Sequence, residues 1–163
     1  MIDLRKNDRL FILIAGILMI VTVLIPMSIV SFSTGDLRIY WMFGIFLDWD
    51  SFAFDSLYTL KLGFIIGGSF FALILLLLGI FLIILANFIK KDKNIKFQEY
   101  LLLSIGLFAL VMPYLFRSLM SLVSIILSSE NIFVFSGFFY SIELIMPISA
   151  ILLLIPGGLK ISE

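Results

Sequence analysis

The chain has 163 residues, of which 63% are hydrophobic, and its mean hydropathy is +1.25. Its 11 basic and 11 acidic residues leave no net charge, so bulk attraction to nucleic acid is not supported. Cysteine and histidine are both missing, which excludes disulfides, thiolate chemistry, and imidazole acid–base or metal chemistry. Ordinary domains are about half apolar, so this composition predicts a protein whose solvent is lipid.

Four apolar runs are long enough to cross a bilayer, which takes about 20 residues each. Because hydrocarbon offers the backbone no hydrogen-bonding partner, each run is predicted to be a helix. The first run is longer than the apolar stretch of a usual signal peptide, so we expect it to be a helix of the folded protein. The expected spans lie at 10–30, 62–89, 101–127 and 132–156.

The charges in the connections predict how these spans are oriented. Basic residues gather before the first run, in the KKDKNIK loop at 90–96 and at Lys160, whereas the first and third connections are mainly acidic. An excess of lysine and arginine marks the cytoplasmic side of a membrane. We therefore expect a multi-pass protein integral to the cell membrane, formed by a single domain over 1–163, with both termini cytoplasmic and an outer loop at 31–61.

The expected fold is all-α: an antiparallel bundle of four transmembrane helices joined by short connections. The SSEN connection at 128–131 is so tight that the third and fourth helices should be neighbours. Small residues let membrane helices approach closely, and we expect this at Gly63, Gly67 and Ser121. They would pack helices within one chain; a seam between two copies is the alternative.

The outer loop combines aromatic residues with aspartates. Its apolar part, 37–47, is too short to cross a membrane. Large apolar residues alternate with turn residues, which predicts a small extracellular β-hairpin from about 38 to 54, with Asp55 as the N-cap of the second helix. This cap is expected to be either a folded platform that contacts another molecule or an interfacial aromatic belt. Its candidate contact residues are Trp41, Gly44, Phe46, Asp48, Trp49, Asp50 and Asp55.

The aspartates of this loop have two interpretations. They could attract cations, or they could simply keep an outer loop soluble. Two carboxylates, Asp48 and Asp50, in an exposed loop make a poor cation site, so no metal site is expected.

Several short segments resemble the claudin family. PMSIV at 26–30 looks like the Pro-Met-containing end of the first claudin helix, and Trp41 followed by GIF at 44–46 is similar to the Trp…Gly-Leu-Trp signature of the first extracellular loop. FDSLYTL at 54–60 resembles the Tyr-Asp-Ser-Leu-rich segment of that loop, and LLLIPGGL at 152–159 resembles the close of the fourth helix. The resemblance implies a non-enzymatic role in adhesion, contact or membrane organisation, with the first outer loop as the working surface.

The chain also departs from the claudin pattern. The pair of loop cysteines is missing, so the family's disulfide cannot form. The spacing from Trp41 to Gly44 is longer by one residue, Phe46 stands where a tryptophan is expected, and the loop is shorter than a claudin's. A paracellular seal or pore therefore does not follow from the resemblance.

Two ionisable residues lie deep in the expected spans, Arg117 and Glu143. A charge near the bilayer centre costs about 2.5–3.5 kcal/mol on insertion scales, so such residues need partners. At about 1.5 Å per residue, both lie roughly 19–20 Å from the third connection, on neighbouring antiparallel helices. We expect an ion pair, with Tyr114 and Tyr140 as supporting hydroxyls on the same helix faces. The pair would act as a clamp that fixes helix register, or alternatively as a proton- or ion-coupling site.

No catalytic motif, such as G-x-S-x-G, a P-loop or H-E-x-x-H, occurs in the chain, so no enzyme activity and no cofactor are expected. Two further functions remain open beside the claudin-like one. The chain could be a small accessory subunit of a larger membrane complex, or a transporter or channel component that uses Arg117 and Glu143. The expected partners are the lipid bilayer and either further copies of the chain or another membrane protein.

Overall fold

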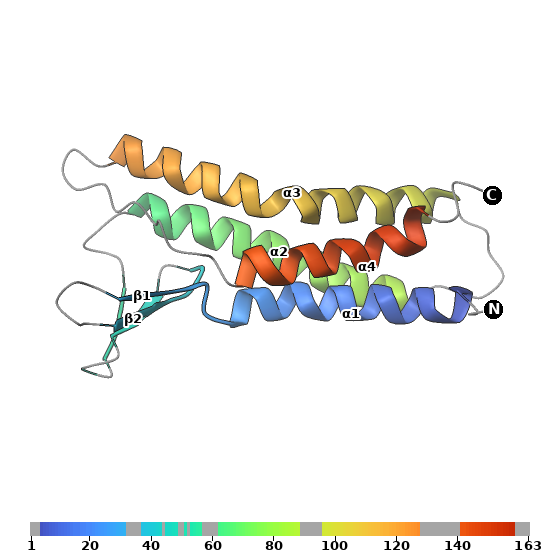
Figure 1. Cartoon of the computed structure of the whole chain (residues 1–163), viewed down its shortest axis with the longest axis horizontal. Helices are drawn as coiled ribbons and strands as arrows, with labels where there is room; N and C mark the ends of the chain where they lie inside the picture. The colour runs from blue at the N-terminus through green and yellow to red at the C-terminus, as the bar shows by residue number, and fades with distance from the viewer. Residues whose placement is uncertain are drawn as a thin grey trace.

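Four helices lie along the long axis of the molecule, and a small antiparallel sheet lies at one end of them (Figure 1). The computed structural model describes residues 4–31, 37–43, 45–48, 51, 53–56, 62–88, 96–127 and 141–158. The helices are α1 (Leu4–Leu24), α2 (Leu62–Phe88), α3 (Lys96–Leu127) and α4 (Met146–Gly158). A π-helical turn, η2 (Ser141–Ile145), leads directly into α4.

Successive helices run in opposite directions, so α1 begins and α4 ends at the same end of the bundle (Figure 1). The helix α1 packs against α2 and α4, and α3 packs mainly against α4. The prediction that the third and fourth helices are neighbours is therefore confirmed, although the SSEN connection lies outside the described residues.

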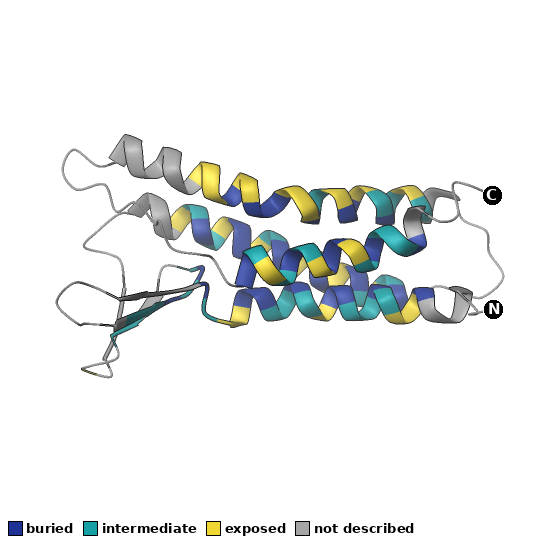
Figure 2. Cartoon of the chain, in the orientation of Figure 1, coloured by how far each residue is buried: buried dark blue, intermediate teal, exposed yellow. Residues whose placement is uncertain are grey.

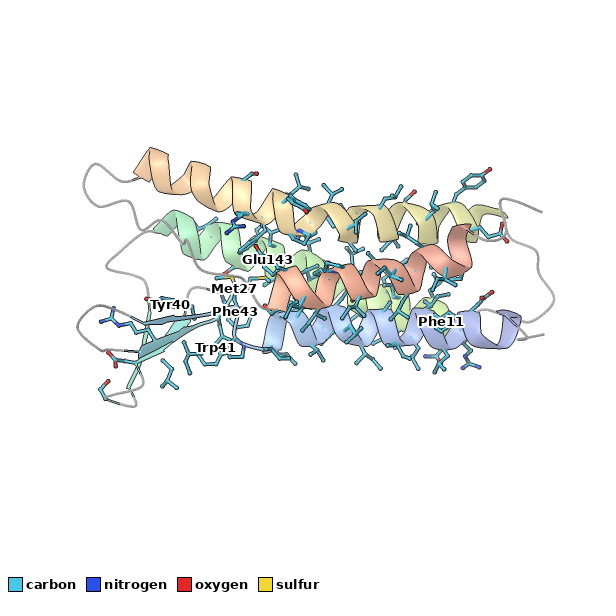
Figure 3. The ribbon with its side chains drawn as sticks, in the orientation of Figure 1. Phe11, Met27, Tyr40, Trp41, Phe43 and Glu143 are labelled. Atoms are coloured by element: carbon cyan, nitrogen blue, oxygen red, sulfur yellow. The ribbon has the colours of Figure 1, made fainter. Side chains whose placement is uncertain are left out.

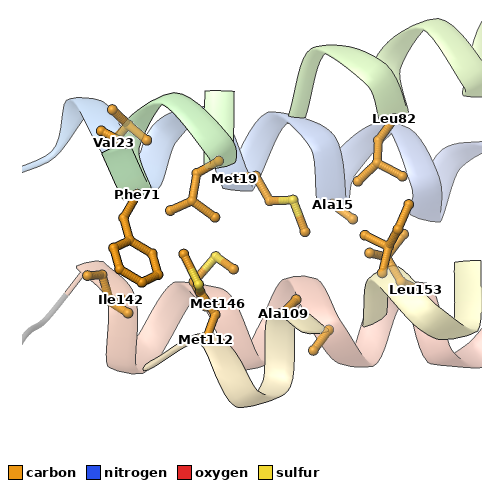
Figure 4. Packing of buried hydrophobic residues seen from close by; sticks show 14 of the residues in the cluster. Ala15, Met19, Val23, Phe71, Leu82, Ala109, Met112, Ile142, Met146 and Leu153 are labelled. Carbon is orange, nitrogen blue, oxygen red and sulfur yellow. The ribbon is translucent and has the colours of Figure 1, made fainter. Parts of the chain in front are cut away.

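Within the described residues, two helices carry a stretch long and apolar enough to cross a membrane: Ile66–Asn87 in α2 and Glu99–Leu119 in α3. A shorter apolar helix covers Ser141–Pro156. The bundle interior is filled by aliphatic, methionine and aromatic side chains (Figure 4). The rings of Phe71 on α2 and Phe116 on α3 meet edge to face, with their centroids 5.4 Å apart, a favourable geometry for an aromatic pair.

Two glycines, Gly16 on α1 and Gly79 on α2, let these helices approach closely. A Cβ atom added to Gly79 would lie 2.7 Å from Ile20 Cγ1 and 2.8 Å from the Gly16 carbonyl oxygen. Glycine is therefore required here because a side chain would force two backbones apart. Gly67, where the sequence also predicts close packing, is partly exposed, and the surroundings of Gly63 and Ser121 lie outside the described residues.

The sheet has four antiparallel strands in the order β1-β2-β3-β4. They are β1 (Ser28–Ser31), β2 (Leu37–Tyr40), β3 (Ile45–Asp48) and β4 (Ala53–Ser56). The pairing of β2 with β3 lies where the sequence predicts a hairpin, with Tyr40 opposite Phe46. Two further strands extend this hairpin on its two sides.

Two boundary predictions are wrong. The first span was expected to continue to residue 30, but α1 ends at Leu24 and residues 28–31 form β1. Pro26 explains the stop, because proline disfavours a helical conformation at the residue before it and donates no hydrogen bond. Asp55 was expected to cap the second helix, but it lies within β4 opposite Phe46, and α2 begins only at Leu62.

Candidate functional site

The structure brings Arg117 and Glu143 together. The Nη1 atom of Arg117 on α3 lies 3.3 Å from the Oε1 atom of Glu143 in η2. The two side chains differ in exposure: that of Arg117 is 54% exposed and that of Glu143 only 15%. The carboxylate is thus largely enclosed by the bundle, while the guanidinium reaches from the bundle to its outer surface.

Buried neighbours fix both members of this pair. Phe116, directly before Arg117, is buried against Phe71. Ile142, directly before Glu143, is buried near Val23 and Phe71 (Figure 4). A π-helical turn inserts extra backbone into a helix and re-aims its side chains, and such turns are frequent at functional sites. Here η2 carries the acidic partner of the pair.

The pair lies at the sheet end of the bundle rather than at its middle. Ile142 is level with Val23 in the last turn of α1, and η2 contacts α1 (Figure 4). Figure 3 shows Glu143 close to the end where α1 gives way to the sheet. The sequence placed both charges deep in the spans because it measured their depth from the third connection. That connection lies outside the described residues, and α3 continues to Leu127, about 15 Å past Arg117.

The predicted tyrosine support does not form around Arg117. Tyr114 precedes Arg117 on the same helix face, but its side chain is turned outward and 74% exposed. It therefore borders the exposed side of the guanidinium and does not enclose the pair. Tyr140 lies outside the described residues.

A second set of contacts joins the sheet to the end of α1. The Nε1–H group of Trp41 donates a hydrogen bond to the Leu24 carbonyl oxygen, at 3.1 Å. The backbone N–H of Met27 donates to the Tyr40 carbonyl oxygen, at 2.7 Å. The last carbonyls of a helix lack partners within the helix, and the indole supplies one for Leu24. Trp41 therefore fixes the sheet to the bundle (Figure 3).

One face of the sheet carries a cross-strand charge pair. Arg38 lies opposite Asp48, and Arg38 Nε is 3.7 Å from Asp48 Oδ2. The side chain of Tyr40, two residues along β2, is buried. Burial raises the pKa of the Tyr40 phenol above its ordinary value, although the neighbouring Arg38 guanidinium lowers the same pKa. These groups rigidify the sheet from within.

The remaining predicted loop residues are placed in part. Phe46 and Asp55 pair across β3 and β4, and only their backbone positions are described. Gly44, Trp49 and Asp50 lie outside the described residues. Among the described residues, no group of three acidic side chains comes close enough together to hold a metal ion.

The opposite end of the bundle holds a contact that the sequence analysis did not identify. The Nη2 atom of Arg9 donates to the Asn87 side-chain oxygen at 3.0 Å, which ties the start of α1 to the end of α2. The predicted antiparallel arrangement could have indicated this contact, because it brings residues near 9 and 87 to the same end of the bundle. The contact joins one of the basic residues that predicted the cytoplasmic side to the neighbouring helix.

Comparison of the chain with models of protein families, with curated proteins and with solved structures finds no match.

Proposed function

We propose that this chain is a non-enzymatic integral membrane protein whose four helices cross the bilayer, with the basic end of the bundle in the cytoplasm and the sheet outside. The observation that carries this proposal is that all four helices expose large hydrophobic side chains. Figure 2 colours the exposed positions of each helix yellow. Large hydrophobic side chains are exposed along the whole bundle, including Leu10, Ile17, Ile66, Phe70, Leu73, Leu77, Leu107, Leu110, Leu115, Leu144, Ile148 and Ile151. A contiguous apolar surface of this kind indicates contact with lipid or another apolar partner.

Helix length supports the same arrangement. The helix α2 has 27 residues and no charged side chain, so it is about 40 Å long and can cross the roughly 30 Å hydrocarbon core of a bilayer. Polar side chains inside the bundle bond to their own helix: Thr22 Oγ1 donates to the Leu18 carbonyl at 2.8 Å, and Ser149 Oγ to the Ile145 carbonyl at 3.1 Å. These bonds satisfy hydroxyl groups that are buried in the bundle and cannot reach water.

Within this arrangement, we propose that the sheet is the working surface, in the claudin-like role of adhesion, contact or membrane organisation. The support is the way in which the sheet is held. The Trp41 indole fixes it to α1, and the Arg38–Asp48 pair links its two central strands. A sheet that is held in this way presents the same surface to every partner, which lowers the entropic cost of binding.

The second candidate is an accessory subunit of a larger membrane complex, which would bind through helix faces. One observation favours it: the half of α3 nearest the sheet exposes Tyr114, Leu115 and Leu119, so much of its surface is open to another helix. In that case, the apolar surface of the bundle would be a protein contact rather than a purely lipid one.

Site-specific photocrosslinking distinguishes the two candidates. Because the chain has no cysteine, Ser51→Cys in the exposed turn between β3 and β4 and Leu77→Cys on the outer face of α2 each give a unique attachment site for a benzophenone maleimide. The proposal expects protein adducts from Ser51→Cys and mainly lipid adducts from Leu77→Cys. Adducts to an unrelated membrane protein from Leu77→Cys alone would favour the accessory subunit and contradict the claudin-like role.

A further inference from the structure

We propose that Arg117 binds the phosphate group of an outer-leaflet phospholipid, whose acyl chains lie along the exposed face of α3. This inference rests on the proposed membrane-spanning arrangement. It assigns to the Arg117–Glu143 pair a lipid ligand in addition to its role in joining two helices.

The first support is the division of exposure within the pair. Glu143 is 15% exposed, so its carboxylate is held inside the bundle, whereas Arg117 is 54% exposed. A guanidinium has several N–H donors in a rigid planar fork, so it can contact a carboxylate on one side and a phosphate on the other. Arginine is favoured for phosphate because the fork matches two of the phosphate oxygens.

The second support is the level of Arg117 along the bundle. Arg117 pairs with Glu143 in η2, the turn that leads into α4 at the sheet end of that helix (Figure 3). Its partner follows Ile142, which is level with the last turn of α1, and Trp41 bonds to the final residue of α1 (Figures 3 and 4). Tryptophan is enriched at the level of the headgroups. These positions place the guanidinium where the phosphates of the outer leaflet lie, and not at the bilayer centre.

The third support is the surface that leads to Arg117 from the membrane interior. Leu107, Leu110 and Tyr114 recur at helical spacing on α3 below Arg117, and all three are exposed. A cation at the head of an apolar stripe fits an amphiphile, with a phosphate at one end and acyl chains along the helix. A free anion would gain nothing from the stripe, so we favour a phospholipid over free phosphate.

Glu143 sets the strength of this site. Its carboxylate orients the guanidinium, but it also carries the same charge as the phosphate and neutralises part of the attraction. Removing the Glu143 charge should therefore strengthen phospholipid binding, while removing the Arg117 charge should abolish it. These opposite effects separate a lipid site from a purely structural ion pair.

The test is the melting temperature of the purified protein in a neutral glycoside detergent, followed by tryptophan fluorescence. We add either dioleoylphosphatidylglycerol or dioleoylglycerol, which has the same acyl chains without the phosphate. The phospholipid should raise the melting temperature of the wild type by about 2–4 °C more than dioleoylglycerol does. This difference should grow in Glu143→Gln and vanish in the double variant Arg117→Gln/Glu143→Gln, whose neutral side chains can still hydrogen-bond.

The matched control is Arg38→Gln, which removes a paired arginine from the sheet and should keep the full difference. Equal stabilisation by both lipids, no growth in Glu143→Gln, or an undiminished difference in the double variant would overturn the proposal. If inorganic phosphate alone raised the melting temperature as much as the phospholipid does, this result would also overturn the proposal, in favour of a free-anion site. If the protein is monodisperse without detergent and no lipid stabilises it, the membrane-spanning arrangement itself is wrong; equal stabilisation by both lipids leaves that arrangement intact.

Discussion

Single residues decide how α3 and α4 fit together, and the Arg117–Glu143 pair is the clearest case. The pair joins a half-exposed cation to a mostly buried anion at 3.3 Å. The sequence predicts that the two residues meet, because they are about equally far from the third connection. Residues at equal distances from the turn between two antiparallel helices lie side by side. Their level relative to the end of α1 could not be predicted in this way, since the apolar run of the first helix does not show that it stops at Leu24.

We expect Glu143→Gln to lower the free energy of unfolding, because it leaves the Arg117 cation without its carboxylate. The exposure of Arg117 limits this loss to about 1 kcal/mol, less than the loss expected for a fully buried pair. In Glu143→Gln/Arg117→Met, much of the loss should be recovered. Unfolding by sodium dodecyl sulfate from a mild detergent gives the comparison, and a single variant as stable as the wild type would show that the pair contributes nothing.

Tyr40 gives a prediction for alkaline pH. Burial favours its neutral phenol, so its pKa is higher in the folded chain than the value of about 10 expected when unfolded. A raised folded-state pKa means that the stability contributed by Tyr40 is complete below pH of about 10 and is lost as the pH rises through the folded-state pKa. The free energy of unfolding should therefore fall above that pH, and should fall less steeply in Tyr40→Phe. Equal pH dependence in the two proteins would contradict this account.

At the scale of elements, the apolar runs predict all four helices, and the alternation of apolar and turn residues predicts the β2–β3 hairpin. The strand β1 was not predicted because its sequence, SIVS, continues the apolar run of α1, and membrane helices tolerate a proline such as Pro26 within a span. The Trp41–Leu24 hydrogen bond and the turn η2 also leave no periodic signal. Both depend on how separate elements come together, which a single element's pattern does not contain.

Gly16 and Gly79 escaped prediction for a related reason. Neither belongs to a G-x-x-x-G pair within its own helix, and only the packing of α1 on α2 brings them into contact. The glycine pair that the sequence does highlight, Gly63 and Gly67, includes a residue that is partly exposed. Spacing within one helix is therefore a weaker guide to close packing than the match between two helices.

Gly79→Ala should destabilise the bundle by about 1–3 kcal/mol, because its Cβ would lie 2.8 Å from a backbone carbonyl that cannot rotate away. The gain in helix propensity from glycine to alanine is about 1 kcal/mol at most, so the clash dominates. The matched control is Gly67→Ala, also on α2, which should leave stability unchanged or slightly higher. Thermal unfolding in detergent compares the two, and equal midpoints would mean that α1 and α2 do not approach closely at Gly16.

For the whole molecule, the two ends of the bundle differ in chemistry. One end carries the Arg9–Asn87 contact and lies next to the basic connections, and the other carries the sheet, Trp41 and the Arg117–Glu143 pair. Between them, all four helices expose large hydrophobic side chains. These features fit the proposed membrane-spanning arrangement, in which the antiparallel helix order would put both chain ends on one side of the bilayer.

The central claim, that the chain crosses a membrane an even number of times with the sheet outside, is tested most directly by cysteine accessibility in cells. The native chain has no cysteine, so Ser51→Cys, Asn94→Cys and Ser162→Cys each introduce a single target. With a membrane-impermeant maleimide, we expect Ser51→Cys to be labelled in intact cells, and Asn94→Cys and Ser162→Cys only after permeabilisation. Labelling of Ser51→Cys only after permeabilisation, or of Asn94→Cys or Ser162→Cys in intact cells, would contradict the account.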